Sequence, residues 1–209
     1  MGRIYSVGRC QKCLPYLNLD TKYKPEEFLA GRKNSQIWII GLNPKKMGEE
    51  QYKLDMLRDV ANLESYFNNP GIHPYFNDFK KVSPILYSML GKDGGVASTD
   101  IVKCFSETFP PHNAKGRQVK KIIHNCQPFL EHQISEMKPK LIVCNGADVC
   151  DVIKKIVVPI QDRKTSYIGA FGENTISVVL SGFIGRIDHY SKRRLGIEIE
   201  SYMKELAII

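Results

Sequence analysis

The sequence predicts an α/β fold in which a central four-stranded parallel sheet lies between two layers of helices. Four β-rich runs support this prediction, and each is separated from the next by enough chain for a helix; they lie at residues 36–40, 100–103, 141–144 and 175–180. Strands that alternate with helical segments are typical of parallel sheets with helical crossovers. We therefore expect three layers, α/β/α, with the strands in the middle.

The clearest helical pattern lies between the second and third runs. Apolar side chains recur there at steps of three and four residues from Val119 to Met137, and the stripe that they form includes Cys126. Pro128 falls inside this pattern, where it would kink the helix or mark a first-turn boundary. Further helices are expected near residues 51–63, 74–90, 146–156 and 190–206.

Length and composition indicate one folded domain. The chain has 209 residues, of which 43% are hydrophobic and 25% charged, a balance typical of a globular protein rather than a disordered one. No apolar run approaches the roughly 20 residues that a membrane helix needs, and the first residues contain no apolar signal stretch. We expect residues 1–209 to form a single cytoplasmic domain that is monomeric and has no membrane partner.

The net charge of +8 favours an anionic partner. A basic surface attracts phosphates and displaces the counterions that surround nucleic acid. Many basic proteins bind no nucleic acid, so charge alone leaves the partner open. Seven basic side chains would contact phosphates if the partner is DNA, and an ordinary solvated face is the alternative; they are Lys115, Arg117, Lys120, Lys121, Lys192, Arg193 and Arg194.

Six cysteines in a chain expected to be cytoplasmic favour metal ligation or plain thiols over disulfides. Cys10 and Cys13 form a C-x2-C pair, Cys104 follows the second predicted strand, and Cys126 lies on the buried stripe of the next helix. A crossover helix that folds back on its strand would bring the last two together, so four thiolates could converge on an iron–sulfur cluster or on zinc. Buried free thiols are the alternative.

Four motifs, taken in order, resemble the iron–sulfur branch of the uracil-DNA glycosylase superfamily, usually called families four and five. They are Cys-Gln-Lys-Cys at 10–13, Gly-Leu-Asn-Pro at 41–44, Thr-Asp-Ile-Val-Lys-Cys at 99–104, and Cys-Gln-Pro-Phe-Leu at 126–130, which runs on through 137–147. The resemblance covers nearly the whole chain. It implies a [4Fe–4S] cluster, with zinc less favoured, that ties segment 1–35 to the domain through Cys10, Cys13, Cys104 and Cys126.

The resemblance also implies an enzyme of base excision repair that hydrolyses the N-glycosidic bond of uracil, or of another deaminated or damaged base, in DNA. The target base must leave the helical stack before the bond is cut. Gly41 and Leu42 match the first active-site motif. Asn43 would orient the attacking water rather than deprotonate it, because an amide has no useful basicity. An ordinary turn residue is the alternative for Asn43.

Asp100 stands where the better-studied branches carry an asparagine that reads the edge of uracil. An amide can accept from N3–H and donate to O4, whereas an ionised carboxylate only accepts. We therefore expect Asp100 to be a general base or to favour a base that presents an amino group, and a cap at the strand end is the alternative. The preference for uracil is left open.

The second family motif, which usually begins with a histidine after the last strand, matches less well. Ser181 takes that position and His189 follows eight residues later, so His189 would stabilise the leaving base only if the loop carries it into the site. A surface role at a helix N-terminus is the alternative for His189. Arg186 would supply the positive charge otherwise. Phe183 and Ile184, flanked by glycines, would fill the stack in place of the flipped base, and a core anchor is the alternative.

An aromatic platform for the flipped base is also expected from the resemblance. Tyr75 and Phe76 are the candidates, and ordinary core packing accounts for them equally well. The departures at Asp100 and Ser181 leave a first rival, a catalytically inactive superfamily member that binds nucleic acid. The second rival is an unrelated zinc-binding protein. Cys144 and Cys150 are expected to be structural thiols.

Overall fold

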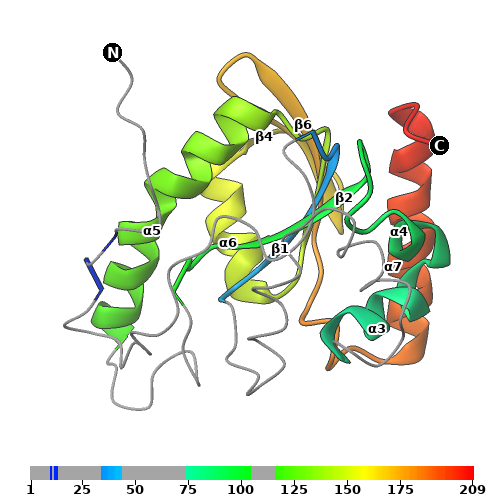
Figure 1. Ribbon diagram of the computed structural model, residues 1–209, viewed down its shortest axis with the longest axis horizontal. Coiled ribbons are helices and arrows are strands. Elements are labelled where there is room, and N and C mark those ends of the chain that lie inside the picture. The colour runs from blue at the N-terminus through cyan, green and yellow to red at the C-terminus, as the bar shows by residue number, and fades with distance from the viewer. Residues whose placement is uncertain (1–9, 11, 14–33, 44–73, 105–115) are drawn as a thin grey trace.

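The computed structural model describes residues 10, 12–13, 34–43, 74–104 and 116–209 (Figure 1). Within these ranges a six-stranded sheet has the strand order β2-β1-β3-β6-β5-β4. In chain order the strands are β1 (Ile37–Gly41), β2 (Val96–Asp100), β3 (Leu141–Cys144), β4 (Val158–Asp162), β5 (Ser166–Phe171) and β6 (Asn174–Val179). The helix predicted near 51–63 lies outside the described residues.

Four neighbouring strands form the parallel part of the sheet. β1 pairs with β2 on one side and with β3 on the other, and β3 pairs with β6. The predicted α/β fold is confirmed, and β5 and β4 extend the parallel part beyond β6 as antiparallel strands. The sequence pattern missed these two because β4 is largely exposed and β5 half-buried, so neither forms a clear apolar run.

The second strand begins and ends earlier than predicted. β2 spans Val96–Asp100, whereas residues 101–104 leave the sheet as bends, so the strand predicted at 100–103 was wrong in its position. All five residues of β2 are buried, but Ser98 and Thr99 interrupt the apolar signal. Ile101 and Val102, which gave that signal, are buried in the core after the strand has ended.

Helices cover both faces of the sheet and confirm the three layers (Figure 1). On one face the core joins Trp38 and Ile40 of β1 to two helices, α5 (Gly116–Met137) and α6 (Ala147–Ile156). On the other face Ile37 and Ile39 pack against three helices, which are α3 (Pro74–Val82), α4 (Pro84–Ser88) and α7 (His189–Glu205). The alternation of β1 side chains between two cores is the period-two pattern of a strand buried on both faces.

The helix predicted at 74–90 is two helices separated at Ser83. The Ser83 hydroxyl accepts from the Leu86 N–H at 3.0 Å and caps α4, and Pro84 at its first position cannot continue the donor pattern of α3. Pro128, in contrast, lies inside an uninterrupted α5. Gly196 of α7 lies against the Val82 carbonyl, where a Cβ would collide, so a glycine permits the close approach of α7 to α3.

Candidate active site

The parallel strands bring the predicted motifs to one edge of the sheet. Parallel strands end on the same side, and in open α/β sheets ligands bind beyond these carboxyl ends. Backbone hydrogen bonds hold the following residues together: Ile101 N donates to Gly41 O at 3.0 Å, Asn145 N to Ile40 O at 2.8 Å, and Gly146 N to Ser181 O at 3.0 Å. The residues after β1, β2, β3 and β6 therefore line a common edge.

Asp100 and Gly41 are in direct contact at this edge. A Cβ added at Gly41 would collide with Asp100 Oδ1 and would lie 3.4 Å from the Tyr75 hydroxyl. Only a glycine permits this approach. Asp100 is 6% exposed, and its Oδ2 has no hydrogen-bond partner among the described residues. A buried, unsatisfied carboxylate oxygen is costly, so this atom is a candidate for contact with a ligand.

Burial raises the pKa of Asp100 to about 7, and the positive charge of Lys103 opposes the rise. Lys103 is itself buried, and its Nζ donates to Thr99 Oγ1 at 2.6 Å. A carboxyl group with this pKa has both protonation states available near neutral pH. It can accept a proton as a base, or in its neutral form donate one hydrogen bond and accept another.

Replacement of Asp100 with Asn should stabilise the fold more at pH 8 than at pH 5. The raised pKa means that the folded state binds more protons than the unfolded state between about pH 4 and 7, so this group lowers stability as the pH rises through that window. The neutral amide of Asp100→Asn removes that loss. Thermal unfolding midpoints of both proteins at pH 5 and pH 8 measure the effect. An equal difference at the two pH values would show that Asp100 is not neutralised by folding.

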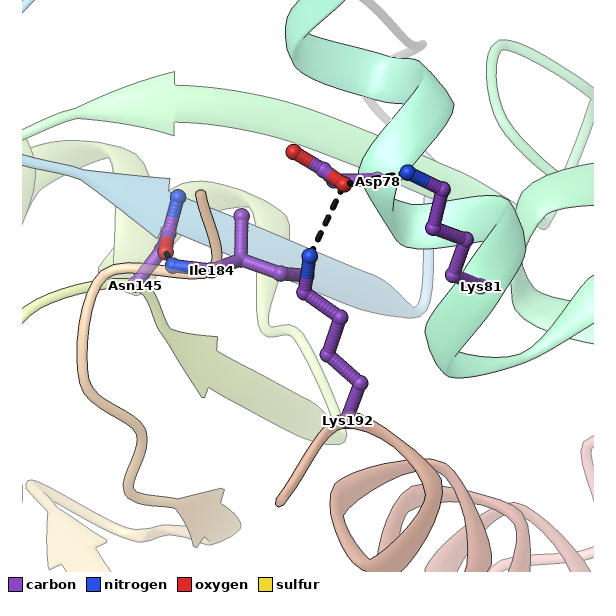
Figure 2. Close-up of polar contacts among 5 residues, drawn as sticks. All are labelled: Asp78, Lys81, Asn145, Ile184 and Lys192. Atoms are coloured by element: carbon purple, nitrogen blue, oxygen red, sulfur yellow. Dashed lines mark hydrogen bonds and ion pairs between the residues drawn. The ribbon is translucent and has the colours of Figure 1, made fainter. Parts of the chain in front are cut away.

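Asn145 belongs to the site although the sequence analysis did not select it. It is 4% exposed; its Nδ2 donates to the Tyr75 hydroxyl at 2.8 Å and its Oδ1 accepts from Ile184 N at 2.7 Å. Figure 2 shows the amide facing the Ile184 backbone. A signal was present in the sequence, because Asn145 is a polar residue directly after a wholly apolar strand. Asn43 and Asp100 are likewise polar residues at or just beyond the carboxyl ends of their strands.

Tyr75 and Phe76 have different surroundings. Phe76 is 3% exposed and belongs to the core under α3, so core packing, the alternative left open for this pair, accounts for it. Tyr75 contacts Phe76 and Phe79 edge to face, with ring centroids 5.0 and 5.6 Å apart, and directs its hydroxyl toward Asn145. Burial first, and then the Asp100 charge, raises the pKa of Tyr75, while the bond from Asn145 opposes the rise. Tyr75 thus stays a neutral phenol.

A short turn after β6 carries the residues predicted from the second motif. Arg186 N and Ile187 N both donate to Phe183 O, at 2.8 and 3.2 Å. Phe183 is 45% exposed, whereas its neighbour Ile184 is buried in the core. The turn therefore presents the Phe183 ring to solvent and uses Ile184 as its anchor.

The other predicted residues of this segment lie at its two ends. The Ser181 hydroxyl donates to Gly182 O at 2.8 Å, while the Ser181 carbonyl accepts from Gly146 N. Arg186 is exposed. His189 is the exposed first residue of α7, and its ring centroid lies 6.1 Å from that of Tyr190. Its part in catalysis remains a prediction.

Lys192 forms an ion pair inside the domain and is not part of a free basic surface. Its Nζ lies 2.9 Å from Asp78 Oδ1, which also binds Lys81 Nζ at 3.2 Å (Figure 2). Burial opposes ionisation of Asp78, but the hydrogen bonds from the two lysines outweigh it and lower the pKa of that carboxyl. Of the other predicted phosphate contacts, Lys115 lies outside the described residues, and the exposed ones are Arg117, Lys120, Lys121, Arg193 and Arg194.

Three of the four predicted ligand cysteines are neighbours in the structure. Cys13, Cys104 and Cys126 are buried, and Cys126 forms hydrogen bonds with the other two. The bond with Cys126, followed by burial, raises the pKa of Cys13; the bond with Cys104 is the largest cause that raises the pKa of Cys126 to about 11. The amide of Asn125 donates to Cys13 Sγ at 3.6 Å and to Lys12 O at 3.3 Å, which ties the cysteine segment to α5.

The described residues contain no group of three or more His, Cys, Asp or Glu side chains in the arrangement of metal ligands. Cys126 contacts both Cys13 and Cys104, and Cys10 is half-buried on the same segment as Cys13. Sulfur is the ligand type that iron–sulfur clusters and zinc both use. The donor atoms thus fit either metal centre in kind, and Cys126 contacts two of the other three predicted ligands.

Cys144 and Cys150 form a second thiol pair. A hydrogen bond from Cys144 is the largest cause that lowers the pKa of Cys150 to about 7, whereas burial raises that of Cys144 well above its usual value. Cys150 Sγ also donates to Ser181 O at 3.5 Å. Their predicted structural role agrees with these internal contacts, which join β3, α6 and the segment after β6.

The fold and the site define an α/β protein whose polar residues gather at the carboxyl ends of parallel strands. A family model described as the uracil DNA glycosylase superfamily matches residues 28–190, more than half of the chain. The protein therefore belongs to the uracil-DNA glycosylase superfamily. No curated protein matches the chain. Among the described helices, none combines the length and the apolar character needed to cross a bilayer.

Proposed function

We propose that the protein is a DNA glycosylase that hydrolyses the N-glycosidic bond of uracil or of another deaminated or damaged base in DNA. One observation gives the proposal its main support. In a chain of the uracil-DNA glycosylase superfamily, a buried carboxyl group with an unpartnered oxygen lies against Gly41 and near Tyr75 at the edge where ligands bind. Such an atom is suited to contact a flipped base or the water that attacks the sugar.

The chemistry requires a positioned water and a means to stabilise the departing base. The sugar gains positive character as the bond breaks, and the base leaves as an anion. Asn43, two residues after the end of β1, would orient the water through its amide. His189 or Arg186, both exposed near the turn after β6, would stabilise the base. Phe183 would occupy the space that the base vacates.

Asp100 has two possible roles that one substitution separates. As an ionised group it would deprotonate the water or accept from an amino group of the base. In its neutral form it would present a donor and an acceptor, as an amide does, to an N–H and a C=O on the base edge. Asp100→Asn should shift the preference toward uracil if Asp100 reads the base, and should abolish base release if Asp100 is the general base.

The test of the proposal is a panel of oligonucleotides that carry uracil, hypoxanthine, xanthine or an ethenobase, in single and double strands. Free base released from at least one of them, measured by chromatography, supports the glycosylase. DNA binding without release of any base would instead favour a catalytically inactive member of the superfamily that acts as a nucleic-acid-binding module.

The proposed DNA surface gives a prediction about salt. Arg117 and Lys120 are exposed near the start of α5. Their joint replacement with alanine should weaken binding to all sequences alike and reduce the slope of log affinity against log salt by about 2, because phosphate contacts carry no base information. The matched control replaces Lys154 and Lys155, exposed in the last turn of α6. An equal effect of both double variants would contradict a local DNA surface on α5.

We also propose that the protein belongs to the iron–sulfur branch of its superfamily and holds a [4Fe–4S] cluster through Cys10, Cys13, Cys104 and Cys126. The contacts of Cys126 with Cys13 and Cys104 support this choice of ligands. When bound, the cluster would supply a structural cross-link rather than a redox step. It would fix segment 1–35 and the chain after Cys104 to α5, in a single domain that we expect to act as a cytoplasmic monomer.

A further inference from the structure

We infer that Asn145 is a positioning residue that couples the Asp100 side of the site to the turn that carries Phe183 and Arg186. The inference rests on the proposed function and adds to it a residue to which the motifs assigned no role. Asn145 lies between the two halves of the site, and its side-chain amide is bonded on both sides.

The first bond joins β3 to α3. Asn145 Nδ2 donates to the Tyr75 hydroxyl at 2.8 Å, across 70 residues of sequence. That hydroxyl lies 3.4 Å from the position of a Cβ on Gly41, beside the Asp100 carboxyl. The backbone of Asn145 is itself fixed, because its N–H donates to Ile40 O at 2.8 Å. The amide therefore holds the Tyr75 ring at the edge where β1 and β2 end.

The second bond joins β3 to the turn after β6. Asn145 Oδ1 accepts from Ile184 N at 2.7 Å (Figure 2), a bond buried within the domain. The hydrogen bonds of Arg186 N and Ile187 N to Phe183 O shape the turn but do not attach it to the sheet. The turn is attached by the bond of Ile184 N to Asn145, by the buried Ile184 side chain and by the partly buried Ile187. Without the amide, Phe183 and Arg186 would keep the form of their turn but lose its register against the strand ends.

Figure 2 shows a second polar contact farther along the same segment, where Lys192 of α7 binds Asp78 of α3. This ion pair fixes α7 after the turn, so Asn145 and Asp78 together restrain the chain between Ile184 and Lys192. Asn145 bonds both this segment and Tyr75, which is why the coupling is assigned to it.

The experiment uses the full chain with Asn145→Leu, which keeps the side-chain size but removes both bonds, and with Tyr75→Phe, which removes only the first. Tyr202→Phe is the matched control, because its hydroxyl bonds Ser166 Oγ at 3.0 Å in the interior between α7 and β5. Hydrogen exchange by mass spectrometry follows the amides of residues 183–187. Single-turnover base release and DNA affinity are measured in parallel.

Asn145→Leu should raise exchange of the Ile184 amide about tenfold or more and slow base release roughly 10- to 100-fold, with DNA affinity changed less than about threefold. Tyr75→Phe should slow release in the same direction while it leaves the Ile184 amide largely protected, and this variant also covers the case in which Asn145→Leu fails to fold. Tyr202→Phe should alter neither release nor exchange in the turn. For Asn145→Leu, a slower base release with nearly unchanged DNA affinity is not the result expected of a residue that only stabilises the fold.

Unchanged exchange at Ile184 in folded Asn145→Leu would overturn the inference, because the amide would then not hold the turn. Raised exchange with an unaltered rate of release would overturn it as well, since the coupling would have no consequence for the reaction. If the wild-type protein releases no base from any oligonucleotide, the proposed function fails, and the exchange result alone decides whether Asn145 holds the turn.

Discussion

Replacement of Cys126 with serine should remove the metal centre and destabilise the protein together. Wild-type protein purified without oxygen should be brown and contain about four irons per chain, since four thiolates are the ligand set of a [4Fe–4S] cluster. Cys126 is the buried residue that contacts both Cys13 and Cys104, so its loss affects the centre of the ligand group. Serine is nearly the same size, and packing changes little. The expected loss of stability, about 4 kcal/mol or more, comes from the lost binding free energy.

Iron content, visible absorbance and thermal unfolding measure this effect. The matched control is Cys150→Ser, since Cys150 is half-buried on α6 and hydrogen-bonded to Ser181 but is not a proposed ligand. The control should keep its iron. Zinc in place of iron in the wild-type protein would contradict the iron–sulfur proposal and favour a zinc centre, and unchanged absorbance in Cys126→Ser would show that the ligand is wrongly assigned.

Asn43→Ala should slow base release by about 10²- to 10³-fold while DNA affinity stays nearly the same. The proposed contact of Asn43 is with the attacking water, so it matters mainly as the sugar acquires positive charge in the transition state. A contact of this kind lowers the rate constant of the bound complex and leaves ground-state binding intact. Single-turnover release under saturating enzyme separates the two quantities.

The matched control for this prediction is Asn174→Ala. Asn174 begins β6 and therefore lies at the opposite edge of the sheet from Asn43. It should leave the rate of release unaltered. A fall in DNA affinity as large as the fall in rate would make Asn43 a binding residue, and an unchanged rate would make it an ordinary turn residue.

The sequence predicted the parallel part of the fold because its buried strands are apolar on both faces. Residues 36–40 and 141–144 are such apolar runs. The helices between the strands show a clear periodicity of apolar side chains. β2 was misplaced because polar Ser98 and Thr99 are buried within it. β4 was missed because an exposed edge strand needs no apolar pattern. The pairing of strands in the folded domain, and not the local sequence, determines the bounds of β2 and the presence of β4.

The site could be predicted where strand ends carry recognisable motifs and not where contacts cross the fold. Asp100 and Gly41 were selected from separate motifs, and the structure brings them into contact. The position of Asn145 after an apolar strand was a signal, but its partners, the Tyr75 hydroxyl and the Ile184 N–H, are distant in the sequence and could not be predicted from it. Lys192 looked like part of a basic run, but its partner Asp78 lies 114 residues away.

Product analysis of the wild-type protein with oligonucleotides that contain a single altered base shows whether the protein hydrolyses the N-glycosidic bond. We predict that it releases the free base and leaves an intact strand with an abasic site, which breaks only after heat or alkali. The proposed site acts through a water, and no amine nucleophile is proposed to form a Schiff base with the sugar. Intact oligonucleotides with no base released, or strands cut directly by the protein, would contradict the claim.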